Sequence, residues 1–195
     1  MTAHIVLALQ TLLSRENTPM DPVVITVGSI HGGTQANIVP DQVTMQLTVR
    51  TFKDAVRKRV LASIAREVKG EAFAAGAPKE PLVEIRPGTD AVYNDPDLTL
   101  RMVSTLQKSL GAANVTEMPA KMTSEDFANY GQAGVKAVLL HIGAVEPGKL
   151  AAAKASGKPL AGPHSPQWAP EYQPTIKAAI TAETSILLDL LGKKQ

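Results

Sequence analysis

The sequence predicts an α/β fold that begins with an α+β unit, in which one antiparallel sheet packs against two helices. Two observations carry this prediction. Residues 43–50, VTMQLTVR, alternate apolar and polar side chains, as a strand covered on one face does. Apolar residues recur at helical spacing in residues 3–14 and 54–70, on either side of the strands.

The first half of the chain is predicted to run helix, strand, strand, helix, strand. Between the helix at 3–14 and the strand at 43–50 lie a strand at 23–30, VVITVGSI, and a glycine-rich loop at 31–41. After the helix at 54–70, residues 81–87, PLVEIRP, are predicted as a further strand. The apolar stripes of the two helices are Ile5, Leu9, Leu12 and Leu13, and Val56, Val60, Ile64 and Val68.

A domain boundary is expected near RPGTDAVYNDPD, which gives domains at 1–88 and 89–195. Asp95 followed by Pro96 predicts the start of a helix. Residues 136–144, KAVLLHIGA, are predicted as a strand buried on both faces, before a long loop at 145–173 and a last helix at 174–191. The stripes of the two helices are Leu98, Met102, Leu106 and Leu110, and Ile176, Ile180, Leu187 and Leu190/Leu191.

Composition excludes several classes of function. The chain has 195 residues, no cysteine and a net charge of +2, which leaves no thiol chemistry and does not favour a nucleic-acid partner. The basic residues of 54–70 are spread around the helix and mixed with acidic ones, so a solvated face is favoured. No apolar run is long enough to span a membrane, and no signal peptide is visible, so a cytoplasmic location is expected by default.

Three places in the sequence could carry chemistry. His164 lies in GPHSPQW, where two prolines stiffen the loop; it is either a metal ligand or catalytic group, or a histidine in solvent. His31, Asn37 and Arg50 offer donors for a carboxylate or an oxyanion, or else form a surface turn and an exposed arginine. Glu125 in MTSEDF could bind a metal, although a helix N-cap at Thr123 or Ser124 is favoured.

Four segments in one order resemble a known family: TVGSIHGGTQANIVPDQVTMQLTVRTF, AVYNDPDL, MTSEDFANY and GPHSPQW. The chain resembles the C-terminal part of the metal-dependent aminoacylase/carboxypeptidase family, with hippurate hydrolases and N-acyl-amino-acid amidohydrolases as its nearest group. The resemblance implies that residues 1–88 form a lid and dimerisation domain, lacking its first strand. Residues 89–195 would form the C-terminal part of an α/β di-metal catalytic domain.

The resemblance also implies roles for single residues. His164 would be a metal ligand, His31 would stabilise the oxyanion, and Asn37 and Arg50 would contact the substrate. Glu125 would lie near the site. The complete enzyme would hold divalent zinc, manganese or nickel and hydrolyse small-molecule N-acyl or N-aroyl amino acids, as a homodimer joined through the lid.

The family's His-x-Asp motif, Glu-Glu pair and general base are absent from this sequence. The chain is therefore expected to be N-terminally truncated and inactive alone. The alternatives are a non-catalytic lid or dimerisation module, and one half of a split enzyme whose N-terminal half is missing here.

Overall fold

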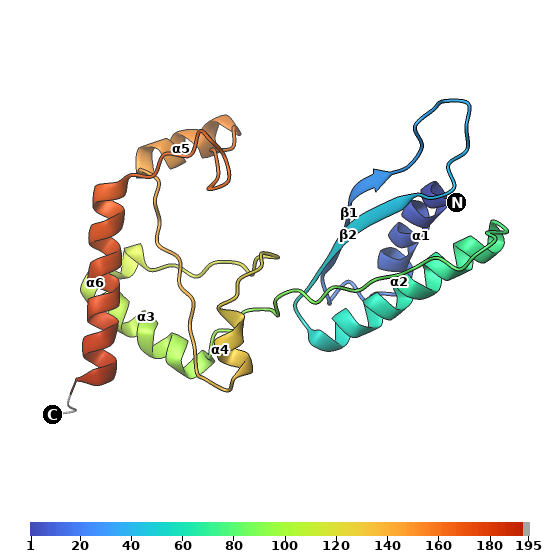
Figure 1. Ribbon diagram of the computed structural model, residues 1–195. Coiled ribbons are helices and arrows are strands. Elements are labelled where there is room, and N and C mark those ends of the chain that lie inside the picture. Colours follow the sequence, from blue (N-terminus) through green and yellow to red (C-terminus); the bar gives the residue numbers. More distant parts are fainter. Residues whose placement is uncertain (193–195) are drawn as a thin grey trace. The chain divides into compact units, whose positions relative to one another are not determined.

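The structure, a computed structural model, describes residues 1–192 and confirms the α/β class (Figure 1). The chain divides into two compact units. Unit 1 comprises Met1–Val92 and Ala120–Ala133, and unit 2 comprises Tyr93–Pro119 and Gly134–Gln195. The predicted domain ranges 1–88 and 89–195 remain a proposal. None of the described helices is long and apolar enough to cross a membrane.

Unit 1 is the predicted sheet with two helices against one of its faces (Figure 1). Its elements are α1 (Thr2–Arg15), β1 (Val23–His31), β2 (Thr44–Thr51) and α2 (Asp54–Ala74), and β1 pairs antiparallel with β2. The predicted helical stripes pack together with the inward residues of both strands. The buried members of this core are Ile5, Leu9, Leu12, Ile25, Val56, Val60 and Ile64.

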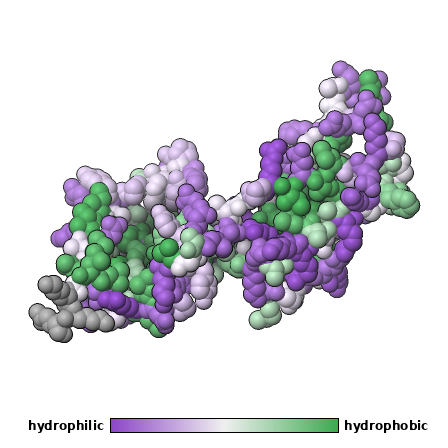
Figure 2. Space-filling view, turned by 60° about the horizontal axis from the view of Figure 1, so that its bottom comes forward, coloured by the Kyte–Doolittle hydropathy of each residue, from purple (hydrophilic) through white to green (hydrophobic). Residues whose placement is uncertain are grey.

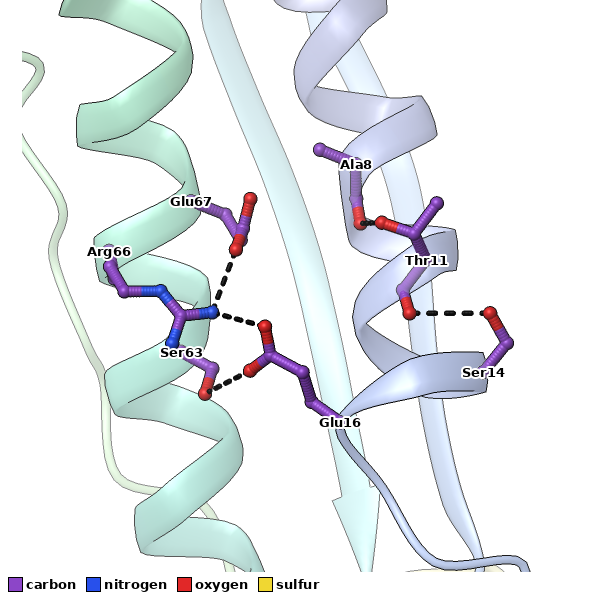
Figure 3. A network of polar contacts seen from close by, with 7 residues as sticks. All are labelled: Ala8, Thr11, Ser14, Glu16, Ser63, Arg66 and Glu67. Carbon is purple, nitrogen blue, oxygen red and sulfur yellow. Dashed lines mark hydrogen bonds and ion pairs between the residues drawn. The ribbon is translucent and has the colours of Figure 1, made fainter.

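Polar contacts at the surface join the end of α1 to the middle of α2 (Figure 3). The Glu16 carboxylate accepts from Ser63 Oγ at 3.2 Å and from Arg66 Nη2 at 2.5 Å. Arg66 Nη2 also donates to Glu67 Oε1 at 2.7 Å. Exposed ion pairs contribute about 0–1 kcal/mol, so the apolar core accounts for most of the stability of unit 1.

Unit 2 is built on two helices that pack against each other, α3 (Pro96–Leu110) and α6 (Tyr172–Leu191). Asp95 caps α3 as predicted, because its Oδ1 accepts from the Leu98 amide at 2.9 Å. The shorter elements of the second half of the chain are η1 (Ala112–Asn114), α4 (Ala128–Gln132), which lies in unit 1, and α5 (Pro147–Ser156). The buried core of unit 2 consists of Met102, Leu106, Ala182 and Ile186.

Two predicted strands are wrong. Residues 81–87 and 136–144 form no β-ladder with any of the described residues, whose one sheet contains only β1 and β2. The physical reason is the same for both segments: a strand exists only where a neighbour pairs with its backbone groups. Leu82 in the first segment is accordingly 85% exposed.

The prediction of a long loop at 145–173 is wrong at α5. The Glu146 side chain accepts from the amides of Gly148 and Lys149, Pro147 occupies the first turn, and Gly157 ends the helix at φ 65°. These start and stop signals were present in the sequence, within a segment rich in alanine.

The predicted apolar stripe of α6 is not the face that packs. Ala182 and Ile186 face α3, whereas Ile176, Ile180 and Leu187 are 54%, 60% and 55% exposed. The helix is therefore apolar on two sides, a pattern typical of a helix buried in a larger core.

Candidate functional site

A β-bulge at Gly28 determines which way His31 faces. The register of β1 against β2 shifts just after Val27, which lies opposite Leu47, so that His31 lies opposite Thr44. Side chains alternate along a strand, so an unbroken β1 would place His31 on the core face with Val27. The bulge places it on the outer face instead. An isolated glycine inside a strand pattern was the one sequence signal for it.

The outer face of the sheet is polar on both strands. Ser29 Oγ donates to Gln46 Oε1 at 3.0 Å, which shows that the two side chains share this face beyond the bulge. The predicted polar side of β2 is exposed, with Met45, Leu47 and Val49 half-buried toward the helices. The exposed residues of β2 are Thr44, Gln46, Thr48 and Arg50.

Two glycines close the loop that follows His31. A Cβ on Gly32 would lie 2.7 Å from Val43 Cγ2, so the two ends of the loop can approach this closely only with glycine there. Gly33 has φ 80°, a conformation that other residues rarely adopt. Asn37 is exposed and lies in this loop, a few residues after His31.

The structure does not bring Arg50 to His31. Both lie on the outer face, but His31 is opposite Thr44 and Arg50 is opposite Val24. At about 3.4 Å per residue, the six steps from Thr44 to Arg50 span about 20 Å. One small substrate molecule cannot touch both side chains within this unit.

Arg50 instead contacts the segment that carries Glu125. Its Nη1 donates to the Met122 carbonyl oxygen at 2.6 Å. In the same segment, the hydroxyl of Ser124 contacts the hydroxyl of Thr89. Glu125 is exposed. The favoured N-cap is wrong, because α4 begins only at Ala128 and has no side-chain cap.

His164 lies in unit 2, exposed on a double turn. The Ser165 amide donates to the Gly162 carbonyl at 2.9 Å, and the Trp168 amide donates to the Ser165 carbonyl at 3.0 Å. Ser165 Oγ also accepts from the Gln167 amide at 3.1 Å. These bonds, with the flanking prolines, hold the backbone on both sides of the imidazole.

The described residues do not form a metal centre by themselves. Among residues 1–192, no three histidine, aspartate or glutamate side chains come together in a group that could hold a metal ion. A pair of divalent metals needs several carboxylates and imidazoles around it. His164 therefore belongs to no such group among the residues that the structure describes.

Residues 1–75 match a family model described as a peptidase dimerisation domain, M20_dimer. IAA-amino acid hydrolase ILR1-like 4 of Arabidopsis thaliana is 31% identical over 171 residues, 84% of this chain and 36% of that protein. N-acetyldiaminopimelate deacetylase of Listeria monocytogenes serotype 4a is 33% identical over 159 residues, 80% of this chain and 41% of that protein. The chain thus spans well under half the length of the curated relatives it matches.

Two solved structures share the fold along nearly the whole chain. A chain from methicillin-resistant Staphylococcus aureus has a TM-score of 0.72 at 24% identity, over 98% of this chain and 46% of that one. Bacillus subtilis YXEP, described as a dinuclear metal binding peptidase from the M20 family, has a TM-score of 0.69 at 23% identity. That match covers 97% of this chain and 45% of YXEP.

Proposed function

We propose that this chain, whose relatives are M20 peptidases and amidohydrolases, provides the lid and the C-terminal part of the catalytic domain of a metal-dependent amidohydrolase. Residues 1–88 would be the lid and residues 89–195 the catalytic part. The reaction is hydrolysis of an N-acyl or N-aroyl amino acid to an acid and an amino acid. The observation that carries the proposal is the outward-facing His31, presented by the bulge of a sheet that matches the dimerisation domain.

His31 and Asn37 are the substrate-facing groups of this proposal. An imidazole N–H and a carboxamide N–H both donate to oxygen, and the oxyanion of amide hydrolysis is stabilised by such donors. His31 therefore stabilises the oxyanion, and Asn37 binds the amide or carboxylate of the substrate. Arg50, about 20 Å away along the sheet, acts on the segment that carries Glu125, through Met122.

His164 is the metal ligand of this proposal. Zinc, manganese or nickel would supply polarisation of the amide carbonyl and an activated water. The rigid double turn suits an imidazole that has to stay in one orientation. The remaining ligands and the general base come from polypeptide outside residues 1–195, in the same chain or in a separate one. Residues 1–195 alone are then inactive.

A homodimer is part of the proposal, because residues 1–75 match a dimerisation domain. The second candidate function, a non-catalytic lid or dimerisation module, is favoured by the lack of a metal-ligand group among residues 1–192. Light scattering on the purified chain separates a dimer from a monomer. A strictly monomeric, well-folded chain contradicts both the dimer and the module.

Metal content and turnover test the proposal. Mass spectrometry of the purified chain should find fewer than two bound zinc, manganese or nickel ions, and the chain should not hydrolyse an N-benzoyl amino acid. Addition of the polypeptide that supplies the other ligands should restore both metals and turnover, and replacement of His164 by Ala should abolish the gain. Two tightly bound metals with turnover by residues 1–195 alone would refute the proposed division.

A further inference from the structure

The segment that carries His164 begins and ends at the same place in unit 2. The Glu171 amide donates to the Ala144 carbonyl at 2.9 Å, so the residues on either side of the segment are hydrogen-bonded to each other. We call residues 145–170 the His164 loop. The helix α5 occupies the first part of this loop, and the double turn around His164 occupies the last part. The loop is therefore closed at its base by a backbone hydrogen bond.

An ion pair between Lys149 and Glu171 spans the same base. Lys149 Nζ lies 2.5 Å from Glu171 Oε1. The Lys149 amide also donates to Glu146 Oε2 at 2.8 Å, in the first turn of α5. Glu171 directly precedes α6, yet its carboxylate does not cap that helix and is bonded to Lys149 instead. The pair therefore joins the start of α5 to the start of α6.

The place of Lys149 on α5 indicates that its side chain serves this pair. The first turn of a helix carries partial positive charge on its free amides, so a lysine there is unfavourable for the helix itself. Loss of the charge would therefore not weaken α5 through the helix dipole. The lysine side chain contributes to the loop through its bond to Glu171.

The His164 loop has no other polar tie to the residues that the structure describes. Every hydrogen bond that residues 145–170 make within residues 1–192 stays inside the loop or ends at Glu171. Figure 2 shows hydrophobic residues gathered on the visible face of unit 2, on the left. Among the described residues, none that forms or contacts the buried core of this unit belongs to the loop, and α5 buries no side chain. The polar contacts at the base are therefore the ones that fix how the loop leaves unit 2.

We propose that Lys149 and Glu171 are positioning residues for His164, because their ion pair keeps the loop closed and so limits where the imidazole can lie. The inference rests on the proposed function, in which His164 is a metal ligand. A ligand on a loop that is already ordered loses less conformational entropy when it binds a metal. Neither Lys149 nor Glu171 touches the metal in this proposal, and both act through the backbone of the loop.

Amide exchange of Ser165 and Trp168, measured by NMR on residues 1–195, reports the opening of the double turn. Lys149→Met keeps most of the side chain and removes the charge, so both amides should exchange about threefold faster. The two paired side chains are 61% and 39% exposed, and loss of an exposed ion pair changes an equilibrium by about fivefold at most. Lys149→Arg retains a cation and should return both rates to within about twofold of wild type. The order parameter of the His164 ring Cε1–H bond, from carbon relaxation, should fall in Lys149→Met and recover in Lys149→Arg.

Salt separates the ion pair from a merely structural role of the lysine. At about 1 M salt the Debye length is about 3 Å, so an exposed pair is weakened. Raising the salt concentration from about 0.01 M to about 1 M should speed the exchange of both amides in wild type, after correction for intrinsic exchange, and leave Lys149→Met unchanged. Lys154→Met is the matched control, because Lys154 is exposed in the last turn of the same helix and forms no ion pair within residues 1–192. Its rates and their salt dependence should match those of wild type.

Equal exchange in wild type and Lys149→Met overturns the inference, as does a rise that Lys149→Arg does not reverse or that Lys154→Met reproduces. Faster exchange throughout α3 and α6 in Lys149→Met would show that the pair stabilises unit 2 as a whole, which also contradicts a positioning role. None of these measurements involves a metal. If replacement of His164 leaves metal binding by the complete enzyme unchanged, the proposed role of His164 fails, and the closure of the loop by Lys149 and Glu171 still stands.

Discussion

Arg50 lies on the outer face of β2 with its guanidinium bonded to the Met122 carbonyl at 2.6 Å. A guanidinium has five donors, so this one bond fixes the direction of the side chain and leaves others free for a ligand. The residue joins the sheet to a segment 72 positions later in the chain. Any effect of Arg50 on activity then includes an effect on the segment that carries Glu125.

Replacing Arg50 by Met should loosen that segment without unfolding unit 1. Amide exchange of residues 120–127, measured by mass spectrometry, should rise about tenfold, as expected from the loss of one charge-assisted hydrogen bond. Arg50→Lys keeps a donor and should show a smaller rise. Unchanged exchange in Arg50→Met would show that the segment is held by other contacts.

The ionisation of Glu146 makes the stability of the start of α5 depend on pH. Hydrogen bonds from the amides of Gly148 and Lys149 hold the pKa of its carboxyl below the ordinary 4.5. The folded form therefore favours the charged carboxylate, and the stabilisation of α5 is present above pH 4.5 and lost as the pH falls through the lowered pKa.

The exchange rates of the Gly148 and Lys149 amides should accordingly rise as the pH is lowered from neutral to about 3, after correction for intrinsic exchange. Glu146→Ala should show the raised rates at neutral pH as well. Glu146→Gln keeps an acceptor oxygen without the titration, so its rates should lie between those of wild type and Ala, with no inflection. An inflection in Glu146→Gln would assign the pH effect to another group.

At this scale the sequence names candidate residues, whose roles remain predictions, but it does not give their arrangement in space. The polar alternation of β2 placed Arg50 on the outer face correctly. The same alternation, applied to β1, would place His31 on the core face. The bulge prevents this, and Gly28 is its one signal in the sequence. The bond from Arg50 to Met122 joins distant segments, and no local pattern records such a contact.

Among the elements, the side chain of Asn94 links the start of α3 to residues 137–139 by hydrogen bonds. Asn94→Leu removes both hydrogen bonds to Leu139 and should lower the free energy of unfolding of unit 2 by about 1–3 kcal/mol. Urea denaturation measures this loss, and Ser104→Ala on the exposed side of α3 should stay within about 0.5 kcal/mol of wild type. If Asn94→Leu lowers the free energy of unfolding no more than Ser104→Ala does, the two hydrogen bonds of Asn94 do not stabilise unit 2.

Helices were the elements that the sequence predicted best, because their signals are local. Asp95 and Pro96 begin α3 where the cap and the proline indicate, and the stripes of α1 and α2 pack as expected. The strands at 81–87 and 136–144 depend on partners, which residues 1–192 do not provide. The helix α6 was predicted correctly, but the side that it buries was not. Two of its faces are apolar, so the helical spacing of apolar residues does not show which face packs against α3.

On the scale of the whole molecule, residues 1–192 contain two separate cores. One contains Leu9, which is fully buried among α1, α2 and the sheet, and the other contains Leu106 between α3 and α6. The two cores share no residue, so the two units can unfold in separate transitions.

Leu9→Ala and Leu106→Ala should each lower the stability of one unit by about 2–5 kcal/mol and leave the other transition unchanged. Calorimetry resolves the transitions, and amide exchange assigns each to its unit. Leu7→Ala, at a position that is 65% exposed on α1, is the matched control and should shift neither transition appreciably. A common shift of both transitions in Leu9→Ala would show that the units unfold as one.

The bulge in β1 has an evolutionary consequence. The extra residue at Gly28 has no partner on β2, so a descendant that lost it would regain a regular ladder with the histidine still opposite Thr44 and still facing outward. A one-position gap in an alignment at Gly28 is therefore neutral for the candidate site. A one-residue deletion between Thr44 and Leu47 on β2 shifts the register by one residue and turns the side chains beyond it to the other face of the sheet. This holds even where the sequence around the histidine is unchanged.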